Sequence, residues 1–289
     1  MRPATPWLQN HWDWRAAGNF CGGGAGTGAL ILAALAADSP AEARILALLG
    51  IALVGAGLSL VWAELGRPLR ALNVFFHPQT SWMTREAMAA VPLALAALAT
   101  ALTGSRTLLA LAALFAAVFL YCQARILHAA KGIPAWRVPQ IVPLILATGL
   151  AEGAGLLAAA ALALPLPDWI GPLLALLVLA RFVAWRRYFG HLTAPGNAPV
   201  AAADVLRRLH PPLVMGGHAA PVALLLLGAV VAPLQGPAVA AAGVVTWLAG
   251  WWMKYAIVTR AAYNQGFAIA RGPARTPGAS RPGCKPGWS

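Results

Sequence analysis

The residues best suited to chemistry gather around one short connection, in the run WAELGRPLRALNVFFHPQTSWMTREAM at residues 62–88. Two carboxylates, Glu64 and Glu86, stand near its two ends. Three arginines accompany them: Arg67, Arg70 and Arg85. Guanidinium groups donate hydrogen bonds to carbonyl oxygens, and a carboxylate at a water boundary can exchange protons. Together these groups suit a quinone, whose two-electron reaction moves two protons.

Glu86 also has a simpler interpretation. It falls in the first turn of a helix expected to begin near residue 84, where the helix dipole favours a carboxylate, so it could be an ordinary helix-end charge. Glu64 ends the preceding helix, where the dipole disfavours a carboxylate, and we expect an arginine of the connection to pair with it. The run RPLRALNVFF between them predicts a short helix lying along the membrane surface.

Membrane-spanning helices must position these groups, because the chain is 60% hydrophobic and only 10% charged, with a mean hydropathy of +0.70. The sequence predicts an all-α integral membrane protein, a bundle of about eight transmembrane helices in residues 1–260, followed by an extended basic tail at 261–289. Apolar runs and their breakers place the spans at 17–37, 43–64, 84–103, 107–130, 139–163, 169–190, 212–233 and 237–258.

The basic residues are distributed unequally between the two sides of the membrane. Of the 21 Lys and Arg residues, all but Arg44 and Arg106 lie in the connections on the side of the termini or within a few turns of them. The positive-inside rule therefore puts both termini on the cytoplasmic side of a bacterial inner membrane. Because the basic residues lie between apolar spans, the net charge of +13 does not indicate nucleic-acid binding.

A glycine-rich run, NFCGGGAGTG at residues 19–28, opens the first span. It lacks the lysine of a phosphate-binding P-loop, and its glycines recur at a spacing of four. Such spacing allows close helix packing, or forms the wall of a ligand crevice near the cytoplasmic face. The three cysteines are far apart and include no C-x-x-C pair, so we expect no metal centre in this chain.

Further polar residues fall inside the predicted spans. Glu152 lies near the midplane, and we expect Arg181 to pair with it. The pair could be structural, Glu152 could belong to a proton route across the membrane, or it could be a neutral, hydrogen-bonded acid. His128, His191 and His218 lie toward the cytoplasmic ends of their helices, as haem ligands, satisfied histidines or hydrogen-bond partners of a quinone.

The runs ELGRPLRALN…TSWMTRE, WDWRAAGNFCGGGAGTG and KGIPAW resemble the DmsC/NrfD-type membrane anchor subunits of molybdopterin oxidoreductases. The resemblance implies a subunit that docks an iron–sulfur subunit, which exchanges electrons with a molybdopterin catalytic subunit, and that supplies the quinone site without haem. Glu86 matches the acidic residue of the S-R-E motif of that family, and Thr84 replaces its serine. Glu64 stands where close relatives of the DMSO reductase anchor have histidine, which leaves the quinone type open.

We therefore expect a quinone, either ubiquinone or menaquinone, as the cofactor of this chain, and iron–sulfur clusters and molybdopterin in its partners only. The expected quinone-binding and proton-transfer residues are Glu86, Glu64, Arg67, Arg70, Asn19 and His218. The connections at 65–83 and 191–211 and the tail are expected to dock the iron–sulfur subunit, through Arg207, Arg208, Trp136 and Arg137.

A catalytic subunit on the cytoplasmic side suits a substrate found inside the cell, such as a CoA thioester. The tail AAYNQGFAIARGPARTPG is similar to that of the anchor of phenylacetyl-CoA:acceptor oxidoreductase. The competing interpretation is a stand-alone secondary transporter in which Glu152 and Arg181 form the coupling pair. The spans lack paired broken helices, and the polar residues cluster at the cytoplasmic surface, which favours the anchor.

Overall fold

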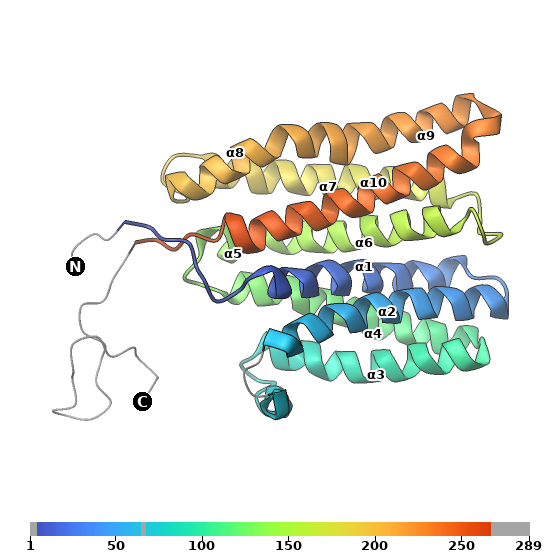
Figure 1. Ribbon diagram of the computed structural model, residues 1–289, viewed down its shortest axis with the longest axis horizontal. Coiled ribbons are helices and arrows are strands. Elements are labelled where there is room, and N and C mark those ends of the chain that lie inside the picture. Colours follow the sequence, from blue (N-terminus) through green and yellow to red (C-terminus); the bar gives the residue numbers. More distant parts are fainter. Residues whose placement is uncertain (1–4, 65–67, 267–289) are drawn as a thin grey trace.

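The computed structural model describes residues 5–64 and 68–266, and the described chain folds into a helical bundle (Figure 1). Its elements are α1 (Trp14–Ala36), α2 (Pro40–Glu64), the 3-10 helix η1 (Pro68–Phe76), α3 (Trp82–Thr103), α4 (Arg106–Ala129), α5 (Pro134–Arg137), α6 (Ile141–Ala160), α7 (Ile170–Thr193), α8 (Val200–Val214), the π-helix η2 (Met215–Ala219), α9 (Ala220–Val230), the 3-10 helix η3 (Ala232–Leu234), α10 (Gln235–Tyr255) and the π-helix η4 (Ala256–Arg260). The all-α fold predicted from composition is confirmed.

Each predicted span corresponds to a long helix. Among the described residues, seven helices are long and apolar enough to cross a membrane. The remaining predicted span is α7, which is 24 residues long and lies alongside the others (Figure 1). Three arginines lower the mean hydropathy of α7: the buried Arg181, and Arg186 and Arg187 toward the C-terminal end of the helix.

The seventh span begins earlier than predicted. One continuous helix runs from Val200 to Val230, so the expected connection at 191–211 shrinks to the few residues between α7 and α8. The predicted span at 212–233 put Pro211 and Pro212 at the beginning of a helix, but they lie inside α8. The reason is burial: α8 has an apolar stripe that packs on the bundle and outweighs the hydrogen bonds lost at proline. The stripe consists of Ala202, Leu206, Leu209 and Leu213.

The glycines of α1 allow close packing on two neighbouring helices. A Cβ atom added to Gly22 would lie 2.6 Å from the backbone oxygen of Leu53 in α2. Gly28 faces the opposite neighbour, α6, where an added Cβ would collide with the backbone oxygen of Gly149. Interfaces of small residues let helix backbones approach in this way. The prediction that the glycine run serves helix packing is confirmed for these positions.

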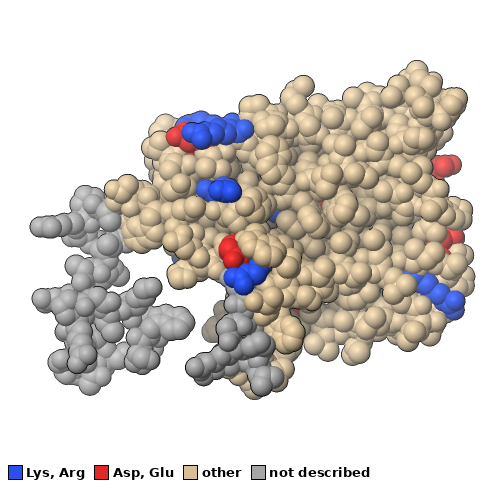
Figure 2. Space-filling model, in the orientation of Figure 1, with Lys and Arg blue, Asp and Glu red and all other residues tan. Residues whose placement is uncertain are grey.

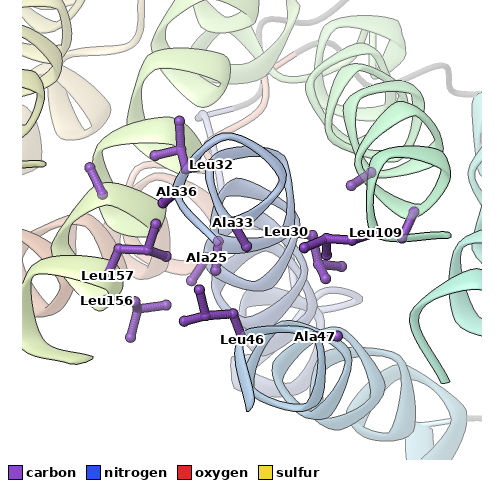
Figure 3. Close-up of a cluster of buried hydrophobic side chains, with 14 of the residues drawn as sticks. Ala25, Leu30, Leu32, Ala33, Ala36, Leu46, Ala47, Leu109, Leu156 and Leu157 are labelled. Atoms are coloured by element: carbon purple, nitrogen blue, oxygen red, sulfur yellow. The ribbon is translucent and has the colours of Figure 1, made fainter. Parts of the chain in front are cut away.

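Apolar side chains fill the space around α1. Figure 3 shows Leu30 of α1 and Leu46 of α2 in this cluster, with Leu109 of α4 on one side of α1 and Leu157 of α6 on the other. All four side chains are fully or almost fully buried. Because α1 contacts α2, α4, α6 and α10, it forms the centre of the bundle.

The two ends of the described chain meet at one end of the bundle. The backbone nitrogen of Gln9 donates to the oxygen of Ala262 at 3.0 Å, and Leu8 pairs with Tyr263. Asp13 then caps α1 by accepting a hydrogen bond from the backbone nitrogen of Arg15 at 2.8 Å, and hydrogen bonds from Arg15 lower the pKa of the Asp13 carboxyl. We call this end of the bundle the terminal end. The meeting of both termini at this end agrees with an even number of spans.

Charged side chains gather toward the two ends of the bundle. Figure 2 shows Lys, Arg, Asp and Glu near both ends of the long axis, with a broad uncharged region between them. Large apolar side chains are exposed in that region, including Leu95, Leu114, Leu176 and Leu226, each more than half exposed. This distribution is the one expected for a lipid-facing belt between two aqueous boundaries.

Candidate functional site

Glu86 lies inside the bundle near the terminal end. Ser81 caps α3, accepting a hydrogen bond from the backbone nitrogen of Thr84 at 3.2 Å. Because the helix therefore begins at Trp82, Glu86 falls in the second turn, and the predicted place in the first turn is wrong. The side chain of Glu86 is only 7% exposed. It is consequently not a solvated helix-end charge.

Asn19 and Gln123 accompany Glu86. The amide nitrogen of Asn19 donates a long hydrogen bond of 3.5 Å to Oε1 of Glu86. The amide nitrogen of Gln123 donates to the backbone oxygen of Asn19 at 3.0 Å. All three side chains are buried, and they come from α1, α3 and α4. The structure thus brings together two of the predicted residues, Asn19 and Glu86.

Gln123 was missed in the sequence. The signal was a glutamine that follows the long apolar run of α4, at a position that the structure shows to be completely buried. Gly23 of α1 makes room for it, since a Cβ atom on Gly23 would collide with the amide nitrogen of Gln123. A glycine opposite a buried amide is a relation between two helices, so neither residue predicts it alone.

A second group of buried polar residues lies further along the same face of α1. The Lys254 ammonium is 2.6 Å from Oε2 of Glu152, and both side chains are fully buried. Lys254 also donates to the backbone oxygen of Phe20 at 2.7 Å. The predicted partner of Glu152, Arg181, is therefore wrong. Lys254 pairs with Glu152 because α10 packs on both α1 and α6. Gly250, one helical turn before Lys254, leaves room for the Glu152 carboxylate.

Arg181 instead binds carbonyl oxygens. It donates to the backbone oxygen of Thr246 at 2.8 Å and to that of Gly217, which belongs to the π-helix η2. A π-helix shifts the backbone hydrogen-bond pattern, which makes a carbonyl accessible to this buried cation. The coupling pair expected of a transporter, Glu152 with Arg181, is not formed by hydrogen bonding in the described residues.

His218 is not placed beside Glu86. Its Nδ1 atom lies 2.9 Å from the oxygen of Leu213, and its Nε2 atom accepts a hydrogen bond from Arg181 at 3.4 Å. The ring borders an apolar groove of about 430 Å³ between α7 and α9. Both ring nitrogens are thus used within the protein. The structure separates His218 from the predicted quinone residues Asn19 and Glu86.

Two arginines brace the surface beside Glu86. The guanidinium groups of Arg85 and Arg125 lie 4.2 Å and 4.5 Å from the ring centroid of Trp82. Arg85 also donates to the backbone oxygens of Pro78 and Gln79, which fixes the end of the 65–81 connection. Cation–π contacts of this kind are favourable at partly desolvated sites.

The other residues of the predicted site lie at or beyond the limits of the residues that the structure describes. Arg67 is outside the described residues. Glu64 ends α2 and Arg70 belongs to η1, and both are located by their backbone. The short helix predicted at 67–76 is present as η1, Pro68–Phe76, in which Leu72 and Phe76 are exposed, and its place along the membrane surface stays a prediction. Among the described residues, no three His, Cys, Asp or Glu side chains could hold a metal ion together.

The predicted docking residues differ in exposure. Arg207 and Arg208 are exposed on α8, and Arg207 pairs with Asp204 at 2.8 Å. Trp136 is only 3% exposed, and its indole nitrogen donates to the oxygen of Ile257 at 2.9 Å. Arg137 is half-buried and donates to the side-chain oxygen of Gln265 at 3.1 Å. Trp136 therefore holds the bundle together, whereas the two arginines of α8 lie at its surface.

Similarity to known proteins is found at the level of the family. No curated protein matches this chain. The family model described as polysulphide reductase, NrfD, matches residues 7–262, which include both buried polar groups around α1. This match extends over nearly all of the described bundle. The chain therefore belongs to the polysulphide reductase, NrfD, family of membrane subunits of molybdopterin oxidoreductase complexes.

Proposed function

We propose that this chain is the membrane anchor and quinone-reactive subunit of a molybdopterin and iron–sulfur oxidoreductase. In this role it passes electrons between a partner iron–sulfur subunit and the membrane quinone pool, while a partner molybdopterin subunit performs the substrate chemistry. Family membership supports the anchor role. The observation that carries the quinone site is the buried contact between Glu86 and Asn19 near the terminal end.

The acceptor oxygens around Glu86 fit the hydroxyl groups of a quinol, the reduced form of a quinone. The oxygen Oδ1 of Asn19 is buried without a hydrogen-bond partner in the described chain, and the Asn19–Glu86 hydrogen bond is long at 3.5 Å. Both residues therefore retain capacity for a polar ligand. A bound quinone supplies two-electron chemistry coupled to two protons. Glu86 holds or releases a proton at its carboxylate, and Asn19 orients a ligand hydroxyl by accepting its hydrogen bond at Oδ1.

The direction in which the complex faces follows from charge. The terminal end carries the predicted cytoplasmic connections, so we assign it to the cytoplasm of a bacterial inner membrane. The exposed Arg207 and Arg208, the neighbouring Arg137 and the basic tail at 261–289 serve the docking of the iron–sulfur subunit. Docking on the cytoplasmic side suits a CoA thioester such as phenylacetyl-CoA as the substrate of the catalytic subunit.

Replacing Glu86 tests the quinone site. Glu86→Gln keeps the size of the side chain but removes its proton exchange, and loss of one proton-transfer group costs about 10²–10⁴-fold in rate. We expect electron flow to quinone to fall by this factor in the purified complex. Dye-coupled activity of the catalytic subunit and membrane attachment should remain, because neither uses the proton.

His128→Ala is the matched control, since His128 lies near the same end of the bundle on α4 and makes no contact with Glu86 among the described hydrogen bonds. It should leave quinone turnover within about twofold of wild type, because His128 is only half-buried and lies outside the proposed site. Normal quinone turnover in Glu86→Gln would contradict the proposed site. Purification of the chain without iron–sulfur and molybdenum subunits would instead favour the transporter.

A further inference from the structure

Three polar side chains from three helices converge on Gly24 of α1. A Cβ atom added to Gly24 would lie 2.6 Å from the Lys254 ammonium, 3.6 Å from Oε2 of Glu152 and 3.8 Å from Oε1 of Gln123. These side chains come from α10, α6 and α4, and all three are fully buried. Glycine at this position is thus what allows an ammonium, a carboxylate and an amide to meet inside the bundle.

The acceptors of this region are incompletely satisfied. Oε1 of Gln123, Oε1 of Glu152 and Oδ1 of Asn19 are buried, and each is without a hydrogen-bond partner in the described part of the chain. A buried acceptor without a donor costs roughly 1–3 kcal/mol. Such groups commonly bind internal water, which needs two to four polar partners. The side of α1 that faces Gln123 and Lys254 is therefore suited to a hydrated polar route.

The route runs between two of the buried carboxylates, those of Glu86 and Glu152. Glu86 accepts from the amide of Asn19, and Gln123 donates to the backbone oxygen of Asn19 at 3.0 Å. The opposite end of the Gln123 amide, Oε1, faces the space at Gly24 that Lys254 and Glu152 also border. Polar groups from Glu86, on α3, through Asn19 and Gln123 thus lead to the space at Gly24 that Lys254 and Glu152 border.

A purely structural pair is a weak explanation for Lys254 and Glu152. Replacing a buried ion pair by apolar side chains of similar size is often neutral or stabilising, because the desolvation of two charges offsets their attraction. The contacts of α6 with α1 and with α10 are in any case made by glycines, such as Gly28 against Gly149 and Gly155 against Gly243. The helices can therefore pack without the charges.

We propose that the Lys254–Glu152 pair is a proton-holding site that exchanges protons with Glu86 through internal water bound to the unpaired oxygens of the Gln123 and Asn19 amides. This inference rests on the proposed quinone function. Quinone chemistry exchanges two protons for two electrons, and the electrons travel to or from the partner iron–sulfur subunit. The Glu86 carboxylate accounts for one proton. The Glu152 carboxylate takes up the other and becomes a neutral acid beside the Lys254 ammonium, and it returns the proton when the direction reverses.

A charge-neutral double variant separates this role from a structural one. Glu152→Gln combined with Lys254→Met removes both charges and leaves no buried ion unpaired, so the complex should assemble with wild-type yield. Quinone turnover should nevertheless fall by about 10²-fold and gain a larger solvent hydrogen isotope effect, because proton supply becomes limiting. Redox-difference infrared spectra should also lose a carboxyl band. A double variant with wild-type turnover, isotope effect and spectrum would overturn the proposal.

Filling the space at Gly24 gives an independent test should the double variant fail to assemble. Gly24→Ala places a methyl group against the tip of the flexible Lys254 side chain, which can shift, so the fold should persist. We expect slower quinone turnover and an altered carboxyl band. The control is Gly55→Ala on α2, where an added Cβ meets nothing within 4 Å and no change is expected. Equal behaviour of the two variants would contradict the proposal.

The wild-type complex distinguishes failure of this inference from failure of the proposed function. If the wild type reduces or oxidises quinone while the Gly24 and double variants match it, only the proton-holding site is wrong. If the wild type has no quinone activity but retains dye-coupled activity, the quinone function itself is wrong.

Discussion

The two sides of α1 use glycine for opposite purposes. Toward α2 and α6, Gly22 and Gly28 meet backbone atoms, so the absence of a side chain brings helices together. Toward α4 and α10, Gly23 and Gly24 meet the tips of Gln123 and Lys254, so the absence of a side chain makes room for polar groups. The first side determines packing, whereas the second admits charge to the interior. The glycines of this one run therefore have two different structural roles.

The largest effect is expected on the polar side. Lys254→Met removes the cation and leaves Glu152 buried without its partner at 2.6 Å, and breaking a buried pair in this way costs about 3–5 kcal/mol. The thermal stability of the purified complex should fall accordingly. Lys131→Met, at an exposed lysine, is the control and should have no measurable effect. Unchanged stability of Lys254→Met would show that Glu152 is neutral without Lys254.

A smaller loss is expected on the packed side. In Gly28→Ala the new methyl group meets the backbone of Gly149, which cannot move as a side chain does, so the interface of α1 with α6 must separate. Overpacking of this kind costs roughly 1–3 kcal/mol. Detergent-solubilised complex should unfold at a lower temperature, whereas Gly55→Ala should not change the midpoint. If Gly28→Ala were as stable as wild type, the contact between the two helices would not be tight.

The smallest effect on folding is expected outside both sides, on α8. Arg207→Glu with Arg208→Glu changes exposed charges, and substitutions at such positions usually alter stability by less than about 0.5 kcal/mol. The bundle should remain intact while the soluble subunits leave the membrane fraction, because charge complementarity at the docking face is lost. Arg44→Glu, at the other end of the bundle, is the control. Retention of the soluble subunits would place docking elsewhere.

The sequence predicted the helices well because membrane spans have few alternatives. Long apolar runs must form helices that satisfy their own backbone hydrogen bonds, so length and composition suffice. The errors occurred where local rules were outweighed by packing. Pro211 and Pro212 stay within a helix because α8 buries an apolar stripe, and Glu86 moves into the second turn because Ser81 provides the cap.

The candidate site was predicted only in part. Glu86 and Asn19 were named, and they meet. Lys254 was grouped with the residues near the cytoplasmic side, since a lysine close to the end of a span ordinarily reaches water. In the structure Lys254 points inward and pairs with Glu152. The sequence of α10 does not predict this inward orientation.

By itself, the sequence determined the helical bundle, the uneven distribution of basic residues and the motif that places the chain in its family, because each depends on residue type along a single segment. Only the tertiary structure decided which buried charges pair and which glycines face polar side chains. Those relations join α1 to α4, α6 and α10, and a cation can satisfy any carboxylate that packing brings within reach. Helix arrangement therefore selected Lys254 over Arg181 for Glu152, and it placed Gln123 between that pair and Asn19, which contacts Glu86.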